Sequence, residues 1–210
     1  MKSKSDIISK FKAHPWHGIS IGTEAPKKLN TYIEIVPSDT VKFEIDKESG
    51  FRKVDRPQKY SNIVPALYGF IPQTYCGDSV ADFAMKKTGR KNMQGDKDPL
   101  DILVLTEKNI NYGDIIVEAI PIGGFRMIDK GEVDDKIISV MAQDEFYSLF
   151  KDLSEIPENI IKRLKHYFLT YKNMPGTEKN TCEITHVYGK KEAQEVIRKS
   201  IDDYQKKFNR

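Results

Sequence analysis

The sequence predicts an α+β fold in which short strands come first and helices come late. From about residue 33 to residue 117, apolar and polar residues alternate between turns rich in Pro, Gly and Asp, which is the period of half-buried strands. After residue 154 the apolar residues recur at helical spacing instead. Several short strands of this kind can close into a small barrel.

Two adjacent strands are expected at residues 31–36 and 41–45, separated by a Pro-Ser-Asp turn. Glu34 faces away from its apolar neighbours in the first strand, and Lys42 and Glu44 share one face of the second. Mixed charges on a strand face are most often exposed to water, where ion pairs contribute little. The alternative is that the cationic groups contact phosphoryl oxygens. Periodicity does not separate these two interpretations.

The remaining elements follow from the same patterns. Further strands are expected at residues 63–71, 102–105, 115–122, 137–141 and 183–188. Between Cys76 and Gly95 the alternation is lost among Gly, Ser, Lys and Arg, which predicts a surface loop. Helices are expected from Pro157, which suits a first helical turn, to about residue 171, and over residues 190–208.

Composition narrows the class of protein. The 34 Lys and Arg residues nearly balance 31 Asp and Glu, and a formal net charge of +3 argues against a dedicated nucleic-acid or membrane binder. No stretch approaches the roughly 20 apolar residues of a membrane span, and the start of the chain carries no apolar leader. Two cysteines are too few for a disulfide framework. We therefore expect one domain over residues 1–210, located in the cytoplasm.

Three carboxylates crowd the entrance to the apolar strand at 102–105. Asp96 and Asp98 point to the same side of an extended chain, and Pro99 biases Asp98 toward that conformation. With Asp101 they repel one another unless a cation offsets their charge, and oxygen ligands suit Mg²⁺, Mn²⁺ or Ca²⁺. The segment therefore predicts a hard-cation site.

A second acidic cluster, residues 129–136, precedes the strand at 137–141 in the same way. Either cluster alone is more often a solvated turn, but two such clusters suggest one shared site. An EF-hand loop starting at Asp96 is excluded, because Leu100 and Asp101 stand where a polar ligand and a glycine are required. The sequence contains neither a Gly-x4-Gly-Lys-Ser/Thr phosphate loop nor a Gly-x-Ser-x-Gly nucleophile elbow.

The full set of motifs resembles that of the soluble family I inorganic pyrophosphatases. Residues 96–101 are similar to the family's Asp-x-Asp-Pro-x-Asp run, and Met127-Ile128-Asp129 with Asp134 and Lys136 is similar to its second acidic motif. Other motifs stand in the family's order at residues 34–37, 42–44, 54–56, 68–69, 166–168 and 171–172. The resemblance covers about residues 14 to 172.

The resemblance implies a role for each matched residue. It implies metal binding by Asp96, Asp101, Asp134 and Asp129, with Asp98 as the general base. It implies contacts to the phosphoryl groups by Lys42, Arg56, Lys136, Tyr68, Tyr171 and Lys172, and a supporting role for Glu34 and Glu44.

The activity implied is hydrolysis of pyrophosphate to two orthophosphates by direct attack of a metal-activated water, which drives biosynthetic reactions that release pyrophosphate. Several Mg²⁺ ions per active site are implied, with Mn²⁺ or Zn²⁺ as substitutes. The fold implied is a five-stranded closed β-barrel of the OB type with flanking α-helices. A homo-oligomer is implied, with a hexamer favoured and a dimer as the alternative. Two other functions remain as alternatives, a phosphohydrolase acting on nucleotides or organic phosphates and a nucleic-acid-binding OB barrel.

Four features depart from the family pattern, and one of them is Val64, which stands where many members have a Tyr before the Pro. Lys97 stands where the family usually has a small or acidic residue, so it is expected either to weaken metal binding or to add a phosphate contact. Lys130 replaces an acid that many bacterial members carry. The segment 76–95 is longer than in compact bacterial members and is expected to be a surface insertion.

Overall fold

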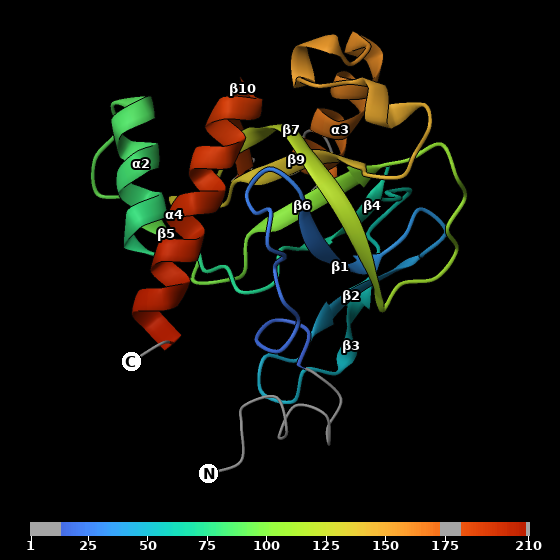
Figure 1. Cartoon of the computed structure of the whole chain (residues 1–210), viewed down its shortest axis with the longest axis horizontal. Helices are drawn as coiled ribbons and strands as arrows, with labels where there is room; N and C mark the ends of the chain where they lie inside the picture. Colours follow the sequence, from blue (N-terminus) through green and yellow to red (C-terminus); the bar gives the residue numbers. More distant parts are fainter. Residues whose placement is uncertain (1–13, 173–181, 209–210) are drawn as a thin grey trace.

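The computed structural model describes residues 14–172 and 182–208 (Figure 1). The start of the chain, where no leader is expected, lies outside these ranges. The strands are β1 Leu29–Ile35, β2 Val41–Ile45, β3 Arg52–Pro57, β4 Leu67–Phe70, β5 Gln94–Gly95, β6 Asp101–Leu105, β7 Ile115–Asp129, β8 Glu132–Val133, β9 Lys136–Met141 and β10 Cys182–Gly189. The helices are α2 Asp78–Thr88, α3 Glu158–Thr170 and α4 Lys190–Phe208, with 3-10 turns at Tyr147–Leu149 and Leu153–Glu155. The α+β prediction is confirmed as a mixed sheet with three helices in the described ranges.

Five strands pair in series, β1 with β4, β4 with β6, β6 with β9 and β9 with β7, and β7 pairs in turn with β1. Within this series only β6 and β9 run parallel. Tyr32 of β1 is in register with Phe70 of β4 on one side and Ile116 of β7 on the other. The long β7 pairs with β1 through its first half and with β10 through its second.

Strand β6 is buried on both faces, which positions the residues at its entrance. Ile102 and Val104 pack in the apolar cluster that includes residues of α2 and α4. Leu103 and Leu105 pack in the cluster that lies under α3. A strand packed on both sides has little freedom to shift, because every side chain has neighbours to displace.

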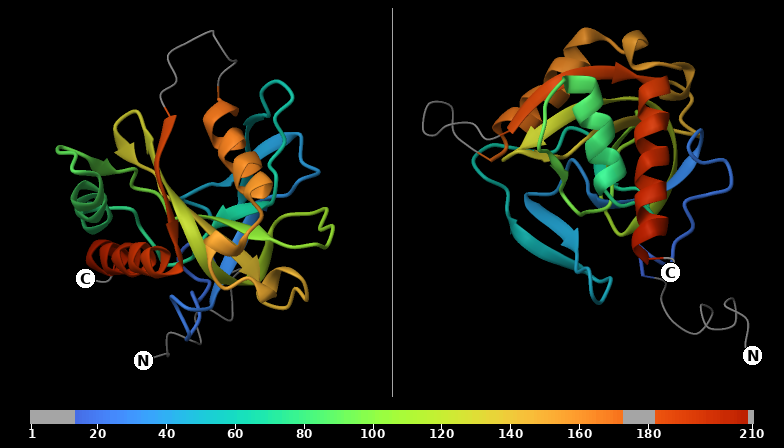
Figure 2. Two further views of the ribbon diagram at one scale, coloured as in Figure 1. Left: turned by 90° about the horizontal axis from the view of Figure 1, so that it is seen from above. Right: turned by 90° about the vertical axis from the view of Figure 1, so that its left-hand side faces the viewer.

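Strands β2 and β3 form a separate two-stranded ribbon that projects from the main sheet (Figure 2). Lys42 on β2 is in register with Arg56 on β3. The strand β3 is absent from the predicted set, because Lys53, Val54 and Asp55 are all exposed and no buried face imposes an alternating pattern. β3 therefore contributes exposed side chains, whereas Ile45 of β2 is buried in the core.

The expectation of a loop between Cys76 and Gly95 is wrong, because this segment contains helix α2. Figures 1 and 2 show α2 lying beside α4. Val80, Ala81 and Ala84 form its buried face. Two of these are alanines, so the stripe carries too little apolar volume to be recognised from the sequence.

The first turn of α2 is capped from far away in the sequence. The carboxylate of Asp203 on α4 accepts hydrogen bonds from the backbone N–H groups of Gly77 (3.1 Å), Ser79 (3.0 Å) and Val80 (3.0 Å). These N–H groups have no partner within the helix, and an anion at this end also complements the helix dipole. The N-cap residue is Gly77, which has no side chain to cap α2, so the cap comes from Asp203 instead.

The two late helices are confirmed. α4 has the predicted bounds, and α3 begins at Glu158, immediately after Pro157. Leu164, Tyr167 and Phe168 form the buried face of α3. In the part of the chain that the structure describes, no helix has the length and apolar character needed to cross a membrane.

Candidate active site

A cavity of about 360 Å³ opens where the β2–β3 ribbon faces the entrances of β6 and β9. Its lining includes every residue to which a role is assigned above: Glu34, Lys42, Glu44, Arg56, Tyr68, Asp96, Asp98, Asp101, Asp129, Asp134, Lys136, Tyr171 and Lys172. The two acidic clusters therefore meet in one place, as the sequence predicts.

The first cluster is held by a tight local turn. Asp98 donates its backbone N–H to the side chain of Asp96 at 3.0 Å. Gly95, just before this turn, passes close to the backbone of Cys76. A Cβ atom at residue 95 would lie 2.1 Å from the carbonyl oxygen of Cys76, so only glycine fits there. The close passage fixes the point from which Asp96 enters the cavity.

Parallel pairing of β6 with β9 joins the two clusters. Asp101 opens β6 in register with Lys136 at the start of β9. Lys136 donates to both Asp101 and Asp134, and the hydroxyl of Tyr68 also donates to Asp101. The Lys136 side chain is only 3% exposed, so its ammonium is a buried charge between two carboxylates.

Asp96, Asp101 and Asp134 together form what we call the acidic wall of the cavity. Burial and mutual repulsion raise the pKa values of Asp96 and Asp101. Burial, followed by the charge of Asp134, raises the pKa of Asp96 well above its ordinary value. The pKa of Asp101 is raised by burial, which outweighs the opposing effect of Lys136. Burial alone would lower the pKa of Lys136, but Asp101 and Asp134 raise it well above its ordinary value. The single ammonium group of Lys136 therefore does not fully balance the negative charge of the acidic wall.

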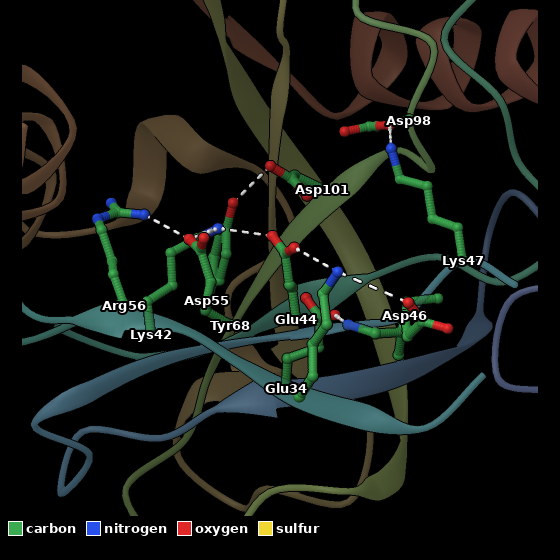
Figure 3. Close-up of polar contacts among 12 residues, drawn as sticks. Glu34, Lys42, Glu44, Asp46, Lys47, Asp55, Arg56, Tyr68, Asp98 and Asp101 are labelled. Carbon is green, nitrogen blue, oxygen red and sulfur yellow. Dashed lines mark hydrogen bonds and ion pairs between the residues drawn. The ribbon is translucent and has the colours of Figure 1, made fainter. Parts of the chain in front are cut away.

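The β2–β3 ribbon supplies a facing cationic wall. Lys42 donates to Asp55 at 2.8 Å and to Glu44 at 3.1 Å, and Arg56 donates to the same carboxylate of Asp55. Figure 3 shows Asp55 between Lys42 and Arg56. Lys42 and Glu44 both line the cavity. Asp55 was missed, although its position directly before Arg56 in the matched motif is a usable signal.

The second acidic cluster reaches the cavity through a hairpin. Lys130 and Gly131 have φ values of 52° and 89° and connect β7 to β8 as a two-residue turn. Asp129, at the end of β7, accepts from the ammonium of Lys172 and from the thiol of Cys182, the latter at 3.1 Å. Lys130 is exposed and is not part of the cavity lining.

Two lysines lie near Asp98, Lys97 in the sequence and Lys47 in the folded structure. Lys97 has a φ of 66° and lines a separate cavity beside α4, so its side chain lies away from the acidic wall. Lys47, in the turn that joins β2 to β3, ion-pairs with Asp98 (Figure 3). Sequence reasoning missed Lys47, and it assigned no individual role to Glu132 of the second acidic cluster, which also lines the cavity.

A family model described as inorganic pyrophosphatase matches residues 31–205. The chain belongs to the inorganic pyrophosphatase family. The inorganic pyrophosphatase of Chlamydia muridarum is 51% identical over 195 residues, which are 91% of this chain and 93% of the relative. Soluble inorganic pyrophosphatase 3 of Arabidopsis thaliana is 36% identical over 192 residues, 91% of this chain and 79% of the relative.

Solved structures agree with this family assignment. The crystal structure of inorganic pyrophosphatase from Thermus thermophilus matches with a TM-score of 0.77 at 28% identity, covering 92% of this chain and 99% of that one. Membership of the pyrophosphatase family identifies the reaction as hydrolysis of pyrophosphate to phosphate.

The donor set of the pyrophosphatase cavity fits divalent cations. In residues 14–172 and 182–208 no three His, Cys, Asp or Glu side chains form a ready-made metal centre, and lysines lie between the carboxylates. The cavity nevertheless contains eight carboxyl groups against five cationic groups. Oxygen donors with excess negative charge in a partly buried site suit hard cations such as Mg²⁺.

Glu34 is a buried carboxyl group of the same cavity. Its side chain accepts the backbone N–H of Ile45 at 2.6 Å, and burial raises its pKa to about 8. Between its ordinary pKa of about 4.5 and this value, the folded protein holds a proton that the unfolded chain has released. Stability therefore falls as pH rises through this window, by up to ~1.4 kcal/mol per pH unit.

Replacing Glu34 by Gln should flatten this pH dependence. The amide cannot ionise, so in metal-free protein Glu34→Gln should lose less stability than wild type between pH 5 and pH 8. Urea unfolding in EDTA at several pH values measures the effect. Exposed Glu145→Gln is the control and should keep the wild-type slope. A Glu34→Gln profile parallel to wild type would contradict the assignment.

Proposed function

We propose that the chain is an Mg²⁺-dependent inorganic diphosphatase in which water attacks pyrophosphate directly. The observation that carries this proposal is the union of both acidic clusters and the cationic β2–β3 ribbon around one cavity. Acidic residues suit metal ions and cationic residues suit phosphoryl oxygens, so both components of a metal–pyrophosphate complex have partners. No covalent intermediate is required.

The metal-binding roles fall to Asp96, Asp101, Asp134 and Asp129, with Mg²⁺ as the preferred ion and Mn²⁺ or Zn²⁺ as substitutes. When bound, such ions neutralise phosphoryl charge and lower the pKa of nearby water. Tyr68 and Lys136 donate to Asp101 and orient its carboxylate. Glu34 and Glu44 support the cavity from the β1 and β2 side.

The remaining side chains handle the proton and the two phosphates. Asp98 takes a proton from water as the new P–O bond forms, and the bridging oxygen leaves with the second phosphate when the old P–O bond breaks. Lys42, Arg56, Lys136, Tyr68, Tyr171 and Lys172 line the cavity as contacts for the phosphoryl oxygens. Positioning and electrostatic stabilisation account for most of the rate in such a site.

The same proposal extends to fold details, assembly and location. The ring of pairings among β1, β4, β6, β9 and β7 supports a five-stranded closed barrel of the OB type. We propose one domain over residues 1–210 with an insertion at 76–95, and a homo-oligomer, with a hexamer favoured over a dimer. The low cysteine content, two in the whole sequence, supports a cytoplasmic location. The near balance of charge supports pyrophosphate and phosphate, rather than nucleic acid or membrane, as partners.

Phosphate release from pyrophosphate tests the metal requirement. Purified protein should release phosphate with Mg²⁺, lose this activity in EDTA and regain it when Mg²⁺ is restored. A panel of nucleotides and organic phosphates under the same conditions should give little phosphate. Inactivity with pyrophosphate across Mg²⁺, Mn²⁺ and Zn²⁺, or equal activity in EDTA, would contradict the proposal.

A further inference from the structure

A buried ion pair lies directly behind the acidic wall. Arg126 of β7 and Asp135, just before β9, both have fully buried side chains. The guanidinium meets the carboxylate through two nitrogens, Nε to Oδ1 at 3.3 Å and Nη2 to Oδ2 at 3.1 Å. This two-point geometry fixes orientation as well as distance.

Three other elements surround the pair. Tyr188 of β10 donates its hydroxyl to Oδ2 of Asp135 at 3.0 Å, and Glu192 of α4 accepts from Nη1 of Arg126 at 2.9 Å. The guanidinium carbon lies 5.3 Å from the ring centre of Phe83 on α2 and 5.2 Å from that of Tyr188. We call this set, Arg126, Asp135, Tyr188, Glu192 and Phe83, the Arg126 clamp.

The clamp is one residue away from the cavity. Asp135 is buried among the clamp residues, whereas its neighbours Asp134 and Lys136 line the cavity. The backbone N–H of Asp134 also donates to the carbonyl of Met127, the residue after Arg126, at 2.9 Å. Two successive residues of β7 thus hold two successive residues of the acidic segment, so movement of Asp135 would carry Asp134 with it.

Stability alone does not explain such a pair. Removing two charges from water is costly, and well-packed apolar residues of similar volume often stabilise a core equally well. What the ion pair adds over apolar packing is a defined direction for the backbone at Asp135.

We propose that Arg126 and Asp135 are positioning residues that hold Asp134 and Lys136 in the cavity. This rests on the metal-binding role proposed for Asp134. Through Phe83, and through Lys87, which donates to Glu192 at 2.8 Å, the clamp also gives helix α2 a function in the active site. Under this proposal, the 76–95 segment supports the acidic wall in addition to lying at the surface.

Mg²⁺ affinity tests the clamp in the full-length protein. Outer partners of metal ligands typically affect affinity by about 10- to 100-fold, so Asp135→Asn should raise the half-saturating Mg²⁺ concentration about 10-fold. Tyr188→Phe removes a single hydrogen bond and should raise it about 3-fold. The rate at saturating Mg²⁺ should stay near wild type in both. Direct Mn²⁺ binding, followed by electron paramagnetic resonance, should weaken in parallel without reference to activity.

The control is Arg90→Ala. This change removes an exposed ion pair with Glu183 near the end of α2 and should leave Mg²⁺ affinity unchanged. Lower thermal stability with wild-type affinity for both metals would overturn the inference. If Asp135→Asn does not fold, the Mg²⁺ and Mn²⁺ affinities of Tyr188→Phe test the inference instead, and wild-type affinity for both metals would overturn it. Asp134→Asn is measured alongside. Unaltered metal affinity in that variant would count against the proposed function itself rather than against the clamp.

Discussion

Asp101→Asn is expected to lower Mg²⁺-dependent pyrophosphate hydrolysis by about 1000-fold. Asp101 is the point on which Tyr68 and Lys136 converge, and it joins the first acidic cluster to the second through the β6–β9 register. In the proposed mechanism, loss of its charge removes one ligand of a site that holds several metal ions, and metal ions bound in such sites stabilise the transition state by several kcal/mol. A loss of about 4 kcal/mol corresponds to this factor in rate.

Steady-state phosphate release over a range of Mg²⁺ concentrations measures the Asp101→Asn effect. The half-saturating Mg²⁺ concentration should rise together with the fall in rate. The matched control is Asp202→Asn, which makes the same chemical change at an exposed position on α4 and should have wild-type kinetics. A folded Asp101→Asn protein that keeps more than about a tenth of the wild-type rate would rule out the metal role.

Asp98→Asn is expected to lower the rate by about 100- to 10,000-fold without weakening Mg²⁺ binding, because it removes the carboxylate proposed as the general base. The Asp98 side chain is 44% exposed and forms an ion pair with Lys47. Loss of its charge should therefore leave the buried carboxylates of the acidic wall in place. The rate of the variant should rise about tenfold per pH unit in alkaline solution, because hydroxide then replaces the missing base.

The separation of rate from metal affinity distinguishes Asp98→Asn from Asp101→Asn. Lys47→Met serves as the comparison, because it removes the ionic partner of Asp98 while leaving the carboxylate in place. It should therefore retain most of the activity. If Asp98→Asn instead raised the half-saturating Mg²⁺ concentration and left the saturated rate unaltered, Asp98 would be a metal ligand and not the base.

The acidic clusters were predictable because strand patterns surround them. Each cluster directly precedes an apolar strand, and the structure places these strands, β6 and β9, side by side and parallel, so that their entrances coincide. Helix α4 was predictable because its apolar residues keep helical spacing over the whole predicted range. In both cases the information lies in a continuous stretch of sequence. The assignment of individual roles depended on the resemblance to the pyrophosphatase family.

The features that were missed depend on contacts between distant segments. Helix α2 is stabilised by two alanines, a valine and the carboxylate of Asp203, none of which produces a strong local pattern. Asp55 resembles any exposed charge until β2 and β3 pair and bring Lys42 to it. Arg126 interrupts an apolar strand, but the sequence does not indicate which acid compensates it.

The cap on α2 has a consequence for how the chain is made. Asp203 is synthesised 126 residues after Gly77, yet its carboxylate satisfies the first backbone N–H groups of α2. Residues 78–88 are synthesised before α4, so this helix end acquires its partner only after α4 has been made. The first turn of α2 is therefore completed only when α4 packs beside it, which links two segments that are far apart in the sequence.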